Sequence, residues 1–160
     1  MNGIVGLRPS WGRVSRFGVI PITWSLDTGG PMTRTVADCA LILNTIAGYD
    51  PRDTASARLP VPDYLAPLDG EVRGMRIGVI REMVDNDFID SEIQGAVKSA
   101  ASLLERMGAT VEDVSLPLVN VAGAIYTATS DGEGASLHRQ RLVARPEEYD
   151  QNSRVRMLAA

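Results

Sequence analysis

The sequence predicts an α/β domain, and three observations support this class. Residues 75–117 follow the pattern of a strand, a helix and a second strand, which favours a right-handed βαβ unit with parallel strands. Residues 35–48 have the periodicity of an amphipathic helix, and residues 118–160 are mostly helical in pattern. Apolar residues make up 44% of the 160 residues and charged residues 22%, as in ordinary globular proteins. We therefore expect a parallel or mixed sheet flanked by helices.

The first part of the chain, residues 1–57, predicts loops followed by one helix. Gly, Pro and Ser recur through residues 3–34, and each proline keeps the residue before it out of helical geometry. The helix begins after Thr35, whose hydroxyl can accept a hydrogen bond from a first-turn amide. Gly48 provides the left-handed residue that ends it.

A linker over residues 58–74 follows, within a proline-rich connection of residues 49–73 that we expect to be mobile in isolation. In the βαβ unit, residues 75–80 and 109–114 are the strands. The helix between them begins at Asp90 or Ser91 and ends before Gly108.

The last part, residues 118–160, predicts a helix over residues 118–143, although three glycines weaken the case for its continuity. Residues 145–149 interrupt the pattern, and a short helix follows. We expect the four parts to belong to a single, partial domain.

Composition excludes several classes of function. A net charge of −4 and an aromatic content of 5% argue against binding to nucleic acid or to an anionic membrane surface. No apolar run approaches the roughly 18 residues of a transmembrane helix, and the first 20 residues lack the apolar core of a signal peptide. The single cysteine, Cys39, excludes an internal disulfide and suits a reducing compartment. We expect a cytoplasmic protein.

One stretch carries a family resemblance. Residues 6–48 read GLRPSWGRVSRFGVIPITWSLDTGGPMTRTVADCALILNTIAG, which resembles the amidase-signature family of amide hydrolases just downstream of that family's nucleophile. The resemblance is strongest over residues 3–57 and extends through residues 68–117. It implies a partial amidase-signature fold. Because the chain starts in the middle of the motif and stops on an apolar stretch, we expect a fragment of about a third of the usual protein.

The resemblance also implies a reaction. In the family, a serine attacks the amide carbonyl, a second serine in a cis peptide relays protons to a neutral lysine, and backbone amides stabilise the oxyanion. All three side chains precede the segment matched here. We therefore expect no catalytic residue in this chain, no cofactor, no metal and no amidase activity from residues 1–160 alone.

The turn from Asp27 to Gly30 is a candidate substrate contact. Its DTGG sequence matches the turn that precedes the family's nucleophile, but Pro31 follows it in place of serine, so it corresponds to a later segment near the acyl pocket. The resemblance implies that Asp27 and Thr28 face the substrate. The alternative is a structural turn in which the Asp27 carboxylate binds nearby backbone amides.

Tyr126 is the third candidate, because some relatives carry a pocket tyrosine in a similar helix, followed by an acidic position, here Asp131 or Glu133. Core packing with a hydrogen-bonded hydroxyl is its alternative.

The remaining polar residues predict no site. Ser15 and Ser25 have no basic partner at a recognisable spacing, and we expect the Ser15 hydroxyl to bond locally. His138, the only histidine, is expected to lie on a solvated helix face. The aspartates of residues 85–90 lack the glycine and glutamate of a calcium loop and are expected to form a capping turn.

Three functions stay open at this point. The first is a fragment of an amidase that acts on a small-molecule amide. The second is a fragment of the A subunit of a tRNA-dependent amidotransferase. The sequence of residues 131–139, DGEGASLHR, favours the first function over this one. The third is a non-catalytic scaffold or binding module. In each, the surface that meets missing parts is exposed, and a homo-oligomer is one expected result.

Overall fold

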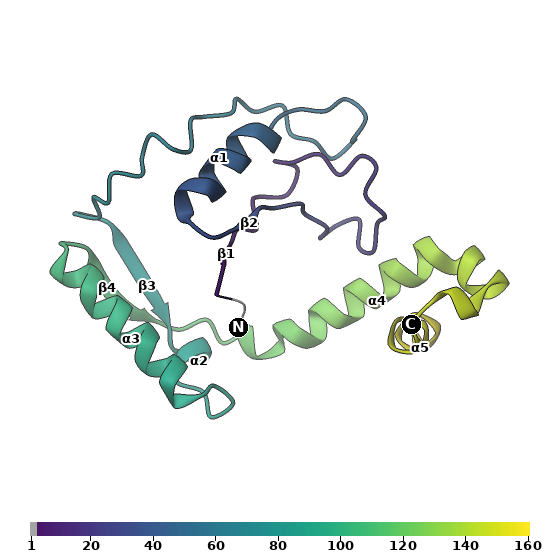
Figure 1. Cartoon of the computed structure of the whole chain (residues 1–160). Helices are drawn as coiled ribbons and strands as arrows, with labels where there is room; N and C mark the ends of the chain where they lie inside the picture. Colours follow the sequence, from purple (N-terminus) through teal and green to yellow (C-terminus); the bar gives the residue numbers. More distant parts are fainter. Residues whose placement is uncertain (1–2) are drawn as a thin grey trace. The chain divides into compact units, whose positions relative to one another are not determined.

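The computed structural model describes residues 3–160. These residues form two compact units, one made of residues 3–68 and 127–160 and the other of residues 69–126. The elements of each unit are labelled in Figure 1.

The first unit contains a short antiparallel ribbon and a well-capped helix. Strand β1 (Val5–Gly6) pairs with β2 (Met32–Thr33). Helix α1 (Val36–Ile46) begins as expected, because the Thr35 hydroxyl accepts a hydrogen bond of 3.1 Å from the amide of Asp38. The helix ends at Ala47, and Gly48 follows with φ of +147°.

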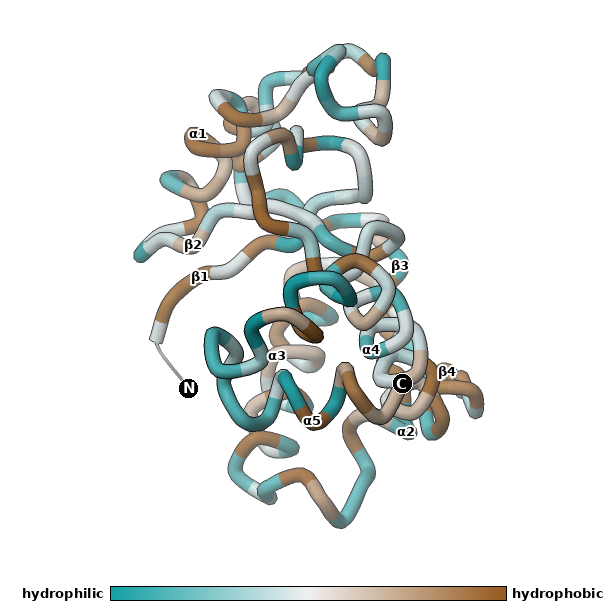
Figure 2. Tube along the Cα trace, turned by 90° about the vertical axis from the view of Figure 1, so that its right-hand side faces the viewer, coloured by the Kyte–Doolittle hydropathy of each residue, from teal (hydrophilic) through white to brown (hydrophobic). Residues whose placement is uncertain are grey.

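Helix α1 is apolar on two faces, and brown positions recur along it in Figure 2. Cys39, Ala40 and Leu43 are buried within the unit. On another side of the helix, Leu41 is 54% and Ile42 39% exposed. A helix that is hydrophobic all round is normally covered on all sides. Within the described part of the chain, α1 is covered on one side only.

The beginning of the long connection is fixed in place, which differs from the mobility expected of residues 49–73. The amides of Gly48 and Ala57 donate to the carbonyl oxygens of Arg13 and Gly12, at 3.0 and 2.9 Å. The Ser15 hydroxyl donates to Asp50 at 2.8 Å. These hydrogen bonds attach residues 48–57 to residues 12–15. The amino-acid composition of the connection gives no sign of them.

The second unit is the expected βαβ unit. Strands β3 (Arg76–Ile80) and β4 (Thr110–Val114) pair in parallel, with Arg76 opposite Thr110 and Ile80 opposite Val114. Helix α3 (Ser91–Arg106) runs between them in the chain and packs alongside (Figure 1). Asp90 caps this helix by accepting from the amide of Glu92 at 2.8 Å. Gly108, with φ of +101°, makes the reversal into β4.

Between β3 and α3 the chain forms α2 (Arg81–Val84), a single turn that has no signal in the sequence pattern. Glu82 fixes it by accepting hydrogen bonds from the hydroxyl of Ser115 and, at 3.0 Å, from the amide of Leu116. These bonds lower the pKa of Glu82, the Ser115 bond most. The link ties the end of β3 to the end of β4.

The C-terminal part is helical, as expected. Helix α4 (Val119–Ala144) begins in the second unit and ends in the first, and it is continuous through its glycines. A 3-10 turn (Pro146–Glu148) forms the expected interruption, and α5 (Gln151–Ala159) follows, capped by Asp150. None of the helices in residues 3–160 is long and apolar enough to cross a membrane.

Candidate functional site

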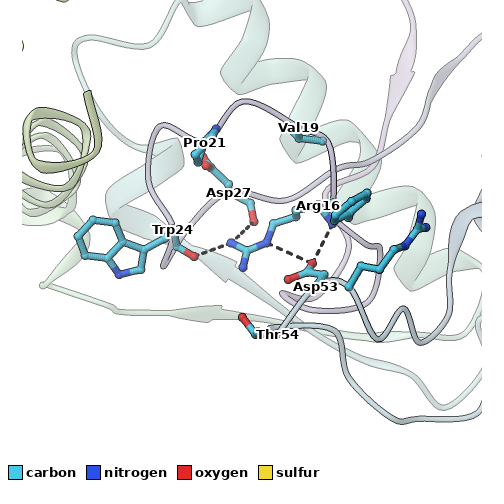
Figure 3. Close-up of a pocket in the computed structure, with 9 residues that line it drawn as sticks. Arg16, Val19, Pro21, Trp24, Asp27, Asp53 and Thr54 are labelled. Carbon is cyan, nitrogen blue, oxygen red and sulfur yellow. Dashed lines mark hydrogen bonds and ion pairs between the residues drawn. The ribbon is translucent and has the colours of Figure 1, made fainter. Parts of the chain in front are cut away.

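The candidate site is a pocket of about 220 Å³ in the first unit, drawn in Figure 3. One wall is the loop of residues 16–27, which carries Trp24 and Asp27. The other wall is the turn of residues 52–54. The lining residues are Arg16, Phe17, Val19, Pro21, Trp24, Asp27, Arg52, Asp53 and Thr54.

Arg16 lies between the two walls and joins them (Figure 3). Its Nη1 donates to the carbonyl oxygen of Trp24 at 2.5 Å and lies 3.5 Å from that of Asp27. Its Nε lies 3.6 Å from Asp53 Oδ2, and the buried Nε atom has no hydrogen-bond partner in residues 3–160. The guanidinium also lies 5.0 Å from the ring centre of Trp11. Arg16 therefore acts as a scaffold between the walls.

Asp53 is held as an anion by backbone amides. Its Oδ2 accepts from the Arg16 amide at 2.8 Å and its Oδ1 from the Ala55 amide at 2.9 Å. The Arg16 amide lowers the pKa of Asp53 most, the Ala55 amide and the Arg16 charge lower it further, and desolvation opposes them. The wall opposite Trp24 thus carries a stable negative charge beside a cation.

Asp50, two residues before this turn, is a second ionised carboxylate. It accepts two side-chain bonds of 2.9 Å from Arg52 and one of 2.8 Å from Ser15. The Arg52 bonds, followed by the Ser15 bond, hold the pKa of Asp50 well below its usual range. The Arg52 guanidinium in turn lies 4.4 Å from the ring centre of Phe17, another pocket residue.

The carboxylate of Asp27 binds its own loop. Its Oδ2 accepts from the amides of Ile22 and Thr23, at 2.8 and 3.0 Å. Asp27 therefore has the alternative, structural role considered from the sequence, in which the carboxylate binds nearby backbone amides. The donors are the amides four and five residues earlier in the chain. Asp27 also lines the pocket, so a contact with substrate stays a prediction.

Thr28 is half-buried and lies beside the pocket without lining it. Its hydroxyl donates to the carbonyl oxygen of Leu26 at 3.2 Å. A substrate contact for Thr28 is likewise a prediction.

Helix α4 is hydrogen-bonded to the pocket loop. Ser25 donates to Glu133 through its hydroxyl at 2.5 Å and through its amide at 3.1 Å. The hydroxyls of Thr23 and Ser130, both buried, lie 3.3 Å apart. Of the two acidic positions singled out after Tyr126, Glu133 therefore holds the loop. The other, Asp131, pairs with Arg156 of α5 at 2.6 Å.

His138 corrects an expectation, because it is half-buried and has a partner on each ring nitrogen. Its Nε2 lies 2.8 Å from the carbonyl oxygen of Pro21, and its Nδ1 lies 3.0 Å from the hydroxyl of Tyr149. These partners are 117 and 11 residues away in the chain. A local pattern of polar residues could not indicate the contact with Pro21.

Tyr126 belongs to the second unit and is 57% exposed, so its side chain is not packed in a core. It is not among the residues that line the pocket of the first unit. Its role in substrate binding stays a prediction.

The other polar candidates make structural contacts. The Ser15 hydroxyl makes the expected local bond, because it accepts from the amide of Phe17 at 3.1 Å. Ser15 and Ser25 also donate to carboxylates 35 and 108 residues away, and for Ser15 this differs from the expectation of a local bond alone. Asp85 pairs with Lys98 at 2.7 Å and Asp90 caps α3. In the part of the chain that the structure describes, no three His, Cys, Asp or Glu side chains are arranged to hold a metal ion.

Comparison with known proteins places the chain in a family. The model of the family described as Amidase matches residues 1–158. The chain is 50% identical over 134 residues to the A subunit of the glutamyl-tRNA(Gln) amidotransferase of Rubrobacter xylanophilus, covering 84% of this chain and 28% of the relative. It is 49% identical over 136 residues to the protein of the same name from Myxococcus xanthus, covering 85% and 28%.

Solved structures agree. The corresponding amidotransferase protein from Thermotoga maritima matches with a TM-score of 0.77 and 34% identity, covering 91% of this chain and 31% of that one. A bacterial aryl acylamidase of the amidase-signature family matches with a TM-score of 0.76 and 26% identity, covering 99% and 34%. The chain thus spans less than a third of the length of the curated relatives above. It belongs to the amidase family.

Proposed function

We propose that this chain is one segment of an amide hydrolase whose serine nucleophile lies outside it. The main support for this proposal is that the family model matches residues 1–158, whereas the chain spans only 28% of the length of relatives such as the Myxococcus xanthus protein. The pocket supports the proposal, because hydrogen bonds fix its walls and its lining residues include no serine. Such a wall can bind and orient a substrate, while attack on the amide requires an activated hydroxyl.

Within that enzyme, the segment would form one side of the acyl pocket. Asp27 would act through the shape of the loop, since its Oδ2 is already bound to two amides, and Thr28 would continue that surface. The exposed Tyr126 offers a hydroxyl that can donate to a substrate carbonyl or accept from a substrate amide. We also propose that the two units are parts of one amidase domain.

The proposed substrate is a small-molecule amide, and the proposed location is the cytoplasm, in keeping with the single buried Cys39. The alternative is a segment of the A subunit of a tRNA-dependent amidotransferase, which the names of the curated relatives favour. In both cases we propose that this segment itself contacts no nucleic acid, because it carries a net charge of −4. A homo-oligomer is proposed for the isolated chain.

The test compares residues 1–160 with a longer product of the same reading frame that includes the residues encoded upstream. Release of ammonia is measured with a panel of small amides, and with glutamine plus glutamyl-tRNA. We expect no turnover by residues 1–160. We expect the longer protein to turn over substrate, and an active-site serine reagent to abolish that turnover. Activity only in the presence of glutamyl-tRNA would select the amidotransferase. Turnover by residues 1–160, or a longer frame without a serine cluster, would contradict the proposal, and the latter would favour the scaffold.

A further inference from the structure

A row of side chains on one face of α4 holds residues 21–25 of the pocket loop. Ser130, Glu133 and His138 contact Thr23, Ser25 and Pro21, respectively. Glu133 and Gly134 follow Ser130 by three and four residues, and His138 follows Gly134 by four, so these positions share one side of the helix. The loop therefore runs against the helix with a contact at every second residue.

A glycine in the same row lies against the loop. A Cβ atom at Gly134 would lie 3.4 Å from the carbonyl oxygen of Ile22 and 3.5 Å from the Met157 side chain. Gly134 is buried, and so is Thr23, which is 3% exposed. The middle of the loop is thus packed against the helix as well as hydrogen-bonded to it.

The chemistry of its partners determines the tautomer of His138. A carbonyl oxygen only accepts, so the bond to Pro21 requires a proton on Nε2. In the neutral imidazole Nδ1 is then the acceptor, and the Tyr149 hydroxyl donates to it. The two rings meet edge to face, with centroids 5.7 Å apart and planes at 82°.

Tyr149 is itself held in position. Its amide donates to the carbonyl oxygen of Pro146 at 3.2 Å. The neighbouring Glu148 bridges Arg141 and Arg145, at 2.6 and 3.0 Å. Tyr149, in the turn after α4, therefore contacts the imidazole of His138, and the imidazole contacts the pocket loop at Pro21.

We propose that His138 is a positioning residue that holds residues 21–27 against α4 and thereby fixes Trp24 and Asp27 in the pocket wall. It is no general base in this arrangement, because the one lone pair of the neutral ring already accepts from Tyr149. The effect on substrate binding rests on the proposed function. The effect on the loop does not.

The loop is tested first in the chain of residues 1–160, by NMR. Two-bond nitrogen–proton correlations report the tautomer, and hydrogen exchange of the Ile22 and Thr23 amides reports the loop. We expect the Nε2–H form in the wild type. In His138→Ala, exchange of both amides should accelerate about five- to tenfold, the effect of losing one hydrogen bond.

Tyr149→Phe is the second variant, because it keeps the ring and should give an intermediate acceleration with the same tautomer. His138→Gln, whose amide can still donate to Pro21, should restore part of the protection. Arg139→Ala, an exposed neighbour, is the matched control and should change nothing. The Nδ1–H tautomer, or unchanged exchange in both His138→Ala and Tyr149→Phe, overturns the proposal.

The substrate consequence is tested in the longer amidase. His138→Ala should raise KM several-fold more than it lowers kcat, because the side chain shapes a binding wall and touches no reacting atom. Faster loop exchange with unchanged KM would leave the positioning role intact and contradict the proposed pocket function. Unchanged exchange would contradict the positioning role whatever the kinetics.

Discussion

Gly30 lies so close to the carbonyl oxygen of Leu7 that a Cβ atom built on it would be 2.0 Å from that oxygen. The approach follows from the ribbon of β1 and β2, which is extended by a hydrogen bond of 3.0 Å from the Leu7 amide to the Pro31 carbonyl. The second glycine of the DTGG turn is thus required by packing. This explains why Gly30 is a glycine in a segment that contains no nucleophile.

Gly30→Ala should therefore destabilise the chain strongly. Its Cβ would meet backbone, which cannot move aside as a flexible side chain would, and we expect a loss of about 2 kcal/mol or more in the free energy of unfolding. Gly29→Ala is the matched control, since its Cβ would lie 3.6 Å from a Val14 methyl group, an ordinary contact. Urea unfolding of both variants checks this. Equal losses for the two glycines would show that the close approach is wrong.

Replacing Asp27 should loosen the pocket loop. Asp27→Ala removes the acceptor of the Ile22 and Thr23 amides, and we expect a loss of about 1–3 kcal/mol. Asp27→Asn keeps one oxygen and should lose roughly half as much. Asp87→Asn, at an exposed position, is the control. Urea midpoints of the three variants are compared, and an Asp27→Ala variant as stable as wild type would contradict the role of the carboxylate.

The regular elements could be predicted from sequence because their signals are local. Thr35 before α1, Asp90 before α3 and Gly108 before β4 each satisfy a neighbouring backbone requirement. The α2 turn could not be predicted, because Glu82 is fixed by residues 33 and 34 positions away.

The site follows the same rule. The DTGG motif points to Asp27, and the bonds of Asp27 to Ile22 and Thr23 are local. The role of His138 could not be predicted because Pro21, its partner, is distant in the chain. A lone histidine carries no signal of such a contact.

The pH dependence of stability should reflect Asp53. Its pKa is lowered in the folded chain, so the stability it contributes is fully present above the unfolded value of about 3.9 and is lost as pH falls below that value through the folded pKa. Asp53→Asn should be less stable than wild type at pH 7, and the difference should shrink below about pH 4. Thermal unfolding at pH 7, 4 and 3 measures it. A difference that is constant down to pH 3 would mean that the carboxylate charge contributes nothing.

The apolar outer face of α1 should drive self-association of the isolated chain. Leu41 and Ile42 point away from the side that buries Leu43, and nothing in residues 3–160 covers them fully. The double variant Leu41→Gln/Ile42→Gln should shift sedimentation velocity towards the monomer while changing the free energy of unfolding by less than about 1 kcal/mol. Leu43→Gln, at a position 6% exposed, should instead destabilise the fold by several kcal/mol, because it buries an unpaired amide. A wild-type chain that stays monomeric as its concentration rises would contradict the proposed oligomer, because this face would then be stable in water by itself.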